Sequence, residues 1–274
     1  MTRTISRTIL CVAALIAVIT GCKKPSDGAT GPAGATGPSG PSYKGNLQGE
    51  VFLYDASGSK ILSAGTQAGD SVILTNNSSG AVMKTVTSST GSYTFTNIST
   101  GTYSVVVTKP GYGTVWTQGI QFAGGGNANR NFSLSQMPST TVTAATAVDT
   151  TITGGAGATA ENYVKVRGAV PVAAGGSTVI VFVSMPSMSS VNSTPGSFST
   201  YYTVNVNPGV LAYKVNIPTA DLYDLGFVSG NTVYFATYIV GGNTNASSYV
   251  DWATGQTVFT ALSSAAVNTS ALVQ

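Results

Sequence analysis

Histidine is absent from this chain, and cysteine is nearly so. The 274 residues include no histidine and two cysteines, Cys11 and Cys22. Catalytic bases that work near neutral pH and most transition-metal sites depend on these two residue types. We therefore expect no catalytic residue, no metal site and no cofactor, and we interpret the chain as a non-enzymatic protein.

Charge is also sparse, at 8% of residues. The twelve basic side chains include Arg3 and Arg7 of an N-terminal leader, so ten of them remain against nine acidic ones once the leader is removed. Nucleic-acid binding needs a clustered basic patch, so the composition argues against that partner. Asp221 and Asp224 are the acids closest in sequence. Such a pair can serve a glycosidase, but the position of this one favours carboxylates that cap or solvate a turn.

The N-terminus combines a short apolar run with a cysteine. Arg3 and Arg7 precede the apolar segment Ile9–Ile19, which is too short to span a bilayer, and Ile19-Thr20-Gly21-Cys22 follows. This pattern resembles the lipobox of bacterial lipoproteins. The resemblance implies that residues 1–21 are a signal peptide and that lipidated Cys22 anchors the chain to the outer membrane. An acidic export signal after Cys22 is nearly absent, so both periplasmic and cell-surface display stay open.

A collagen-like repeat follows the anchor. Glycine recurs at every third position from Gly28 to Gly40, within a segment that we delimit as residues 22–43. The composition cannot form a core and predicts a linker. Five triplets favour a flexible, extended spacer, although three lipidated chains in one membrane would also permit a short homotrimeric stalk.

Residues 44–135 show the alternation typical of half-buried antiparallel strands. Tyr93 and Phe95 share one face of a strand, as Tyr103 and Val105 do in the next. The runs GEVFLYD and TGSYTFTNISTGTYSVVVTKPGY resemble the carboxypeptidase regulatory-like domain. The resemblance rests on Gly91, Tyr93, Phe95, Gly101, Tyr103, Lys109, Gly111 and Tyr112. It implies a seven-stranded β-sandwich similar to transthyretin and starch-binding-like domains. We expect no zinc-peptidase catalytic domain, because the chain has no histidine.

A second β-rich region follows a Thr-, Ala- and Gly-rich stretch. We predict a linker over residues 136–160 and a second sandwich over 161–274. The sequence leaves open whether the first strand of this sandwich already lies at Ala147–Thr153. The pattern of apolar and turn residues in Asp224–Tyr238 resembles the late strands of a fibronectin type III or immunoglobulin-like module. Both faces of Thr232–Val240 are apolar, which indicates either a central strand covered on both sides or a tyrosine-bearing binding face. The predicted fold class is therefore all-β, with two sandwiches.

Aromatic side chains are the candidates for a glycan site, because their rings stack on the apolar faces of sugars. Two pairs stand near polar loops: Tyr112 with Trp116, and Tyr249 with Trp252. The alternative for each tryptophan is packing in a core.

Two short motifs resemble the Asp-Ser/Thr-apolar signal for O-glycosylation in Bacteroidetes-type bacteria. They place candidate modified residues at Ser71 and Thr150.

These features predict an envelope lipoprotein that presents non-catalytic β-sandwich modules for adhesion or for binding glycan or protein. A purely structural spacer and a polysaccharide-binding accessory to a partner enzyme are the alternatives. The expected partners are the membrane, through the lipid, and a polysaccharide or an envelope protein.

Overall fold

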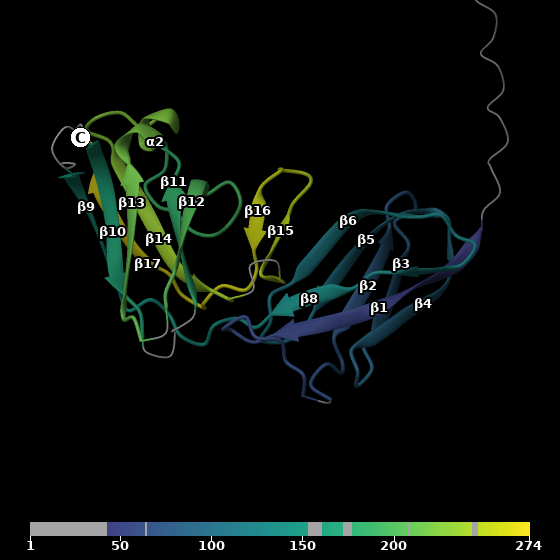
Figure 1. Cartoon of the computed structure of the whole chain (residues 1–274). Helices are drawn as coiled ribbons and strands as arrows, with labels where there is room; N and C mark the ends of the chain where they lie inside the picture. The colour runs from purple at the N-terminus through teal and green to yellow at the C-terminus, as the bar shows by residue number, and fades with distance from the viewer. Residues whose placement is uncertain (1–42, 64, 153–160, 172–176, 208, 243–245) are drawn as a thin grey trace, which may run out of the picture. The chain divides into compact units, whose positions relative to one another are not determined.

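The computed structural model describes residues 43–63, 65–152, 161–171, 177–207, 209–242 and 246–274. The predicted signal peptide, Cys22 and the collagen-like repeat lie outside these ranges. The regular secondary structure of the described chain is almost entirely β, as predicted, and its strands form two sandwiches (Figure 1).

The first sandwich is built from the strands up to residue 135. One of its sheets contains β4 (Ser92–Ser99), β1 (Lys44–Tyr54), β7 (Asn127–Asn129) and β8 (Phe132–Ser135). The other runs in the order β3 (Val82–Val86), β2 (Ser71–Asn76), β5 (Gly101–Thr108) and β6 (Val115–Phe122). The predicted alternation holds, because Tyr93, Phe95, Tyr103 and Val105 all lie in the core between the sheets.

The long strand β1 organises the first sheet. It pairs with β4 in antiparallel fashion on one side and with β7 and β8 in parallel fashion on the other. β7 lies against residues 46–48 and β8 against residues 51–54, so the two short strands follow one another along the same edge of β1. The break between them falls opposite Gly49 and Glu50.

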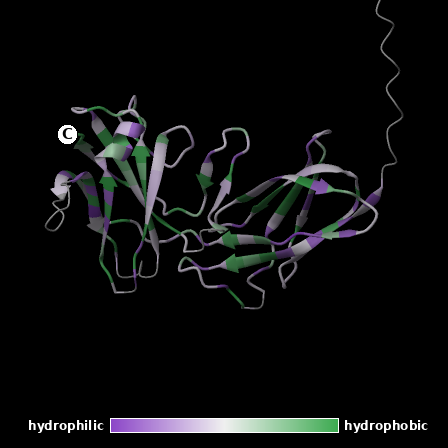
Figure 2. Ribbon diagram, turned by 45° about the horizontal axis from the view of Figure 1, so that its top comes forward, coloured by the Kyte–Doolittle hydropathy of each residue, from purple (hydrophilic) through white to green (hydrophobic). Residues whose placement is uncertain are grey.

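The second sandwich also has two sheets. One runs β13 (Ala212–Pro218), β10 (Glu161–Ala169), β9 (Ala144–Ile152), and the other runs β12 (Phe198–Asn205), β11 (Thr178–Ser184), β14 (Thr232–Val240), β17 (Val267–Leu272). A separate hairpin is formed by β15 (Ser248–Val250) and β16 (Thr257–Phe259), and the short helix α2 spans Thr219–Asp224. Figure 2 shows apolar residues concentrated in the strands. Within the described ranges, no helix is long and apolar enough to cross a bilayer.

The structure places a strand inside the predicted linker over 136–160, close to the first strand that the sequence left open at Ala147–Thr153. Strand β9 occupies Ala144–Ile152 and pairs with the whole of β10. Its residues are mostly Ala and Thr, so its sequence gives little hydrophobic alternation, and the pairing with β10 supplies what the pattern lacks.

Strand β14 settles the choice left open for its two apolar faces. Val233, Phe235 and Ile239 lie in the core between the sheets. On the opposite face, Tyr234 and Tyr238 pack with a second cluster of buried residues, which includes Phe182 and Phe198. The tyrosines of β14 are therefore packing residues on a central strand whose second face is covered.

Candidate functional site

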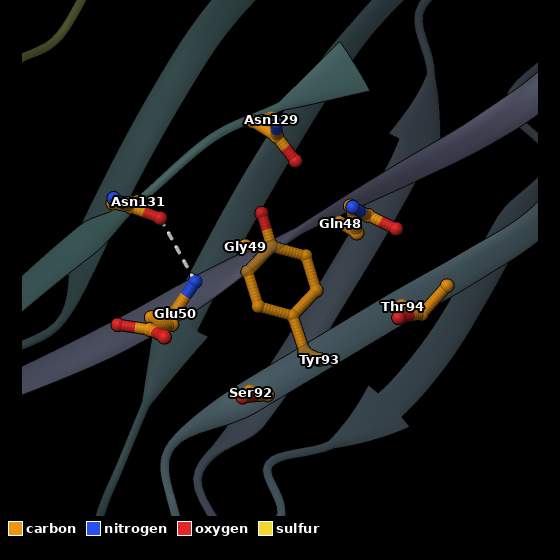
Figure 3. A pocket seen from close by; sticks show the side chains of 8 residues that line it. All are labelled: Gln48, Gly49, Glu50, Ser92, Tyr93, Thr94, Asn129 and Asn131. Atoms are coloured by element: carbon orange, nitrogen blue, oxygen red, sulfur yellow. Dashed lines mark hydrogen bonds between the residues drawn. The ribbon is translucent and has the colours of Figure 1, made fainter. Parts of the chain in front are cut away.

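A polar groove of about 510 Å³ opens across the first sheet of the first sandwich. It lies where β7 ends and β8 has not yet begun, so the regular ladder along β1 is interrupted there, and the Gln48 carbonyl accepts a hydrogen bond from the Arg130 backbone nitrogen at 2.8 Å. Its lining comes from the strands β1 and β4 and from the β7–β8 junction (Figure 3): Gln48, Gly49, Glu50, Ser92, Tyr93, Thr94, Asn129 and Asn131.

Gly49 allows the chain to pass close to β1 at this junction. A Cβ atom at residue 49 would lie 1.7 Å from the carbonyl oxygen of Arg130, a distance that no side chain tolerates. The same carbonyl accepts a hydrogen bond from the buried Tyr93 hydroxyl at 2.7 Å. Burial raises the pKa of Tyr93, so this phenol stays protonated as a donor. Gly49 and Tyr93 thus fix the position of the junction that forms one side of the groove.

Asn131 fastens the other end of the junction. Its Oδ1 accepts a hydrogen bond from the backbone nitrogen of Glu50 at 2.9 Å, which replaces the ladder bond lost at the break (Figure 3). The Asn131 side chain therefore has a structural role, because its amide oxygen is already bonded to the backbone of β1.

Three polar side chains of the groove are open to a ligand. Gln48 stands opposite Thr94, and Glu50 stands opposite Ser92, across the β1–β4 pair. In the described part of the chain, the side chains of Gln48, Glu50 and Thr94 make no hydrogen bond to another residue, and Glu50 and Thr94 are exposed. Together they offer an amide, a carboxylate and a hydroxyl to a bound molecule.

This set of groups suits binding better than hydrolysis. Glu50 is the one carboxylate in the groove lining, whereas glycoside hydrolysis commonly uses two carboxylates facing one another. Among the residues that the structure describes, no three His, Cys, Asp or Glu side chains gather as metal ligands. What the groove supplies is a hydrogen-bonding surface.

Two of the four predicted aromatic residues meet each other. Trp116 of β6 and Tyr249 of β15 contact edge to face, with ring centroids 5.7 Å apart and both residues half-buried. Tyr112 is also half-buried and packs against the core of the first sandwich. All three rings are thus partly engaged in packing, and their contact with a glycan stays a prediction.

Trp252 is the exception among these aromatic residues. It is 64% exposed, and its ring lies so close to Gly119 that a Cβ atom there would come within 2.0 Å of it. One part of the indole therefore rests on backbone while the remainder stays in solvent.

The two neighbouring acids, Asp221 and Asp224, have different surroundings. Asp221, in the first turn of α2, accepts a hydrogen bond from the Tyr202 hydroxyl at 3.0 Å, whereas Asp224 is exposed at the end of that helix. The structure thus agrees with the prediction of a solvated turn.

The modification motifs differ in accessibility. The Oγ atom of Ser71 is buried without a hydrogen-bond partner, and Asp70 beside it is fully buried. A glycosyltransferase would therefore reach Ser71 only if β2 opened. Thr150 on β9 is partly exposed, so modification there stays a prediction, and Cys22 lies outside the described residues.

The groove was not among the sequence predictions. Its signal was the run NANRN at residues 127–131, in which three amide side chains alternate with Ala128 and Arg130 next to a glycine triplet. Alternation of this kind predicts a short strand with one amide-rich face, but not which strand it will join.

Residues 51–135 match the family model of the carboxypeptidase regulatory-like domain, which confirms the resemblance for the first sandwich. The match covers less than half of the chain and therefore describes this sandwich alone. The matching model describes the regulatory-like domain and not a peptidase catalytic domain. No match to a curated protein was found.

Several solved structures are weakly similar. A candidate carbohydrate-binding protein from Bacteroides uniformis ATCC 8492 shares 13% identity over 82% of this chain and 98% of its own, with a TM-score of 0.27. A DUF3823 family protein from Bacteroides ovatus ATCC 8483 shares 11% identity over 84% and 100%, with a TM-score of 0.26. A second one, from Bacteroides uniformis ATCC 8492, shares 16% over 85% and 97%, with a TM-score of 0.23. Similarity at this level carries no conclusion about function.

Proposed function

We propose that this protein is a lipid-anchored envelope component whose first sandwich binds a hydroxyl-rich glycan without cleaving it. The observation that carries the proposal is the polar groove, in which Gln48, Glu50 and Thr94 present hydrogen-bonding groups that no other described residue uses. Gln48 and Glu50 lie on the face of β1 opposite to the buried Leu47 and Val51. Thr94, paired with Gln48, lies on the same outward face of β4.

The chemistry of the groove matches sugar hydroxyls. Each hydroxyl both donates and accepts a hydrogen bond, and the groove offers amide donors together with amide, hydroxyl and carboxylate acceptors. Specific sites usually combine a concave surface with a few well-placed polar groups, and the groove has both. Because Glu50 has no second carboxylate in the lining, the groove lacks the usual means of hydrolysis.

The anchor is proposed from the sequence. Cys22 in its lipobox-like setting would carry the lipid, and the collagen-like segment would hold the sandwiches away from an outer membrane. Incorporation of labelled palmitate that is lost in Cys22→Ser supports this arrangement. Protease treatment of intact cells then separates the two orientations, because sandwiches that face the periplasm are protected.

Glycan binding is tested with the full-length protein in a neutral detergent on an array of bacterial and plant polysaccharides. The variant Gln48→Ala/Thr94→Ala removes two groove groups that make no internal hydrogen bond. We expect it to lose roughly tenfold or more in affinity for any glycan retained by the wild type, because two hydrogen bonds are lost. Thr203→Ala is the control, since Thr203 is exposed on a strand of the second sandwich.

Two outcomes contradict the groove proposal. If no glycan binds the wild type, the protein is better described as a structural spacer. If binding survives in the groove variant but is lost in Trp252→Ala, the exposed indole is the contact and the groove is not. Turnover of a polysaccharide by the pure protein would overturn the non-catalytic assignment.

A further inference from the structure

A second surface, on the other sandwich, gathers basic side chains. Strand alternation places Lys165 and Arg167 of β10 on the same face of their sheet, opposite to the face that carries the buried Val164 and Val166. Lys214 of β13 belongs to the same outward face and stands directly opposite Arg167. In a chain with 8% charged residues, three cations on one small sheet are a marked concentration.

No described carboxylate neutralises these cations. Among the described residues, none of Lys165, Arg167 and Lys214 forms an ion pair with a carboxylate. Asp149 of β9 is paired with the buried Val164 and faces the interior of the sandwich, where its Oδ2 is buried. Glu161, at the start of β10, accepts a hydrogen bond from the Tyr163 hydroxyl.

The pairing of Arg167 with Lys214 is itself unfavourable. Like charges directly opposite one another on adjacent strands destabilise a sheet. An anion bound across the two strands would remove this repulsion and gain from both charges at once.

A trough runs along the same face. Its volume is about 610 Å³, and Lys165, Arg167 and Lys214 contribute to its lining. Small side chains form much of the remainder, including Ala144, Ala169 and Ala212, and Thr146 adds a hydroxyl. The trough therefore combines a floor of small apolar side chains with cationic groups on neighbouring strands.

We propose that this basic trough, formed by β9, β10 and β13, binds an acidic polysaccharide. The apolar C–H faces of a sugar ring fit against alanine side chains, while carboxylate or sulfate groups of the same polysaccharide pair with the lysines and the arginine. A free inorganic anion would use the charges but not the alanine surface. The site is separate from the groove of the first sandwich and does not depend on its function.

The test uses the full-length protein in a neutral detergent, with polygalacturonate as the acidic polymer and dextran as the neutral one. In the Gln48→Ala/Thr94→Ala background, in which the groove is disabled, we expect calorimetry to show binding of polygalacturonate but not of dextran. The affinity should fall as salt rises from roughly 0.05 to 0.5 M, because exposed charges are screened. Arg167→Gln/Lys214→Gln should weaken binding by roughly tenfold or more.

The matched control is Lys44→Gln/Lys84→Gln, which removes the same charge from exposed lysines of the first sandwich. This control should bind polygalacturonate as the wild type does, and so should Gln48→Ala/Thr94→Ala. Thermal unfolding checks the trough variant, whose midpoint should be equal to or above that of the wild type once the like-charge pair is gone.

Four results overturn the proposal. An equal loss in the lysine control would show an effect of net charge alone, and loss in Gln48→Ala/Thr94→Ala would move the acidic ligand to the groove. Equal binding of dextran in the Gln48→Ala/Thr94→Ala background would remove the role of the cations. Absence of polygalacturonate binding, with vesicles containing phosphatidylglycerol bound through Arg167 and Lys214, would identify a membrane surface as the partner instead.

Discussion

The ammonium group of Lys109 bonds the carboxylate of Asp70, whose side chain has no solvent exposure. Lys109 lies in the KPGY segment that resembles the carboxypeptidase regulatory-like domain, and Asp70 immediately precedes β2. Lys109 also donates a hydrogen bond to the backbone oxygen of Ala68 at 3.0 Å. The ion pair therefore fastens the end of β5 to the turn before β2, inside the first sandwich.

Removal of the cation should destabilise the first sandwich strongly. Lys109→Met leaves the Asp70 carboxylate buried without its counter-charge, and we expect the free energy of unfolding at pH 7 to fall by about 3 kcal/mol. Lys84→Met, at an exposed lysine of β3, should change it by less than about 0.5 kcal/mol. Urea unfolding followed by circular dichroism measures both variants.

The pH dependence of the Lys109→Met deficit identifies its cause. Burial already raises the pKa of Asp70 above its ordinary value of 3.8, although Lys109 opposes this, and loss of Lys109 raises it further. The folded state then binds more protons than the unfolded state between the two pKa values, so stability is lost as pH rises through that window. The deficit should shrink toward pH 4. A deficit of equal size at pH 4 and pH 7 would point to lost packing of the lysine stem instead.

The Tyr202–Asp221 hydrogen bond gives a prediction for the second sandwich. Tyr202→Phe should lower the free energy of unfolding at pH 7 by about 1 kcal/mol, because the Asp221 carboxylate loses a donor. Tyr201→Phe is the matched control, since the Tyr201 hydroxyl has no hydrogen bond to a described residue and its ring contacts are kept.

Alkaline pH should close the gap between wild type and Tyr202→Phe. Burial, together with the bond to Asp221, raises the pKa of Tyr202 to about 12 from 10.0. The raised pKa stabilises the wild type fully below pH 10, and this contribution is lost as pH rises toward 12, because the unfolded phenol ionises first. Urea unfolding at pH 7, 9 and 10.5 would contradict the assignment if the gap stayed constant.

Gly49 is predicted to be intolerant of any side chain. Gly49→Ala would drive a methyl group into the Arg130 carbonyl, 1.7 Å away, and shift the β7–β8 junction. We expect a loss of about 2 kcal/mol or more and a loss of the groove's ligand binding. Gly126→Ala, where a Cβ atom meets nothing within 4 Å, is the control and should leave stability nearly unchanged. Equal effects of the two substitutions would mean that the junction is flexible.

The strands of the first sandwich were predictable because local alternation and buried position coincide there. Tyr93 and Phe95, or Tyr103 and Val105, are two residues apart and lie on one face of a strand, so the pattern alone places them in the core. Strand β9 was harder, because its Ala and Thr residues alternate little in hydropathy and its place depends on pairing with β10.

The sequence by itself determined the fold class of the protein. Regular alternation and turn residues are local properties, and they already indicate an all-β chain. The tertiary structure decided where the candidate sites lie. The groove exists because β7 and β8 join β1 in parallel from about eighty residues away, and the basic trough exists because β13 brings Lys214 beside Arg167. Such pairings depend on the packing of the whole sheet, and no local pattern specifies them.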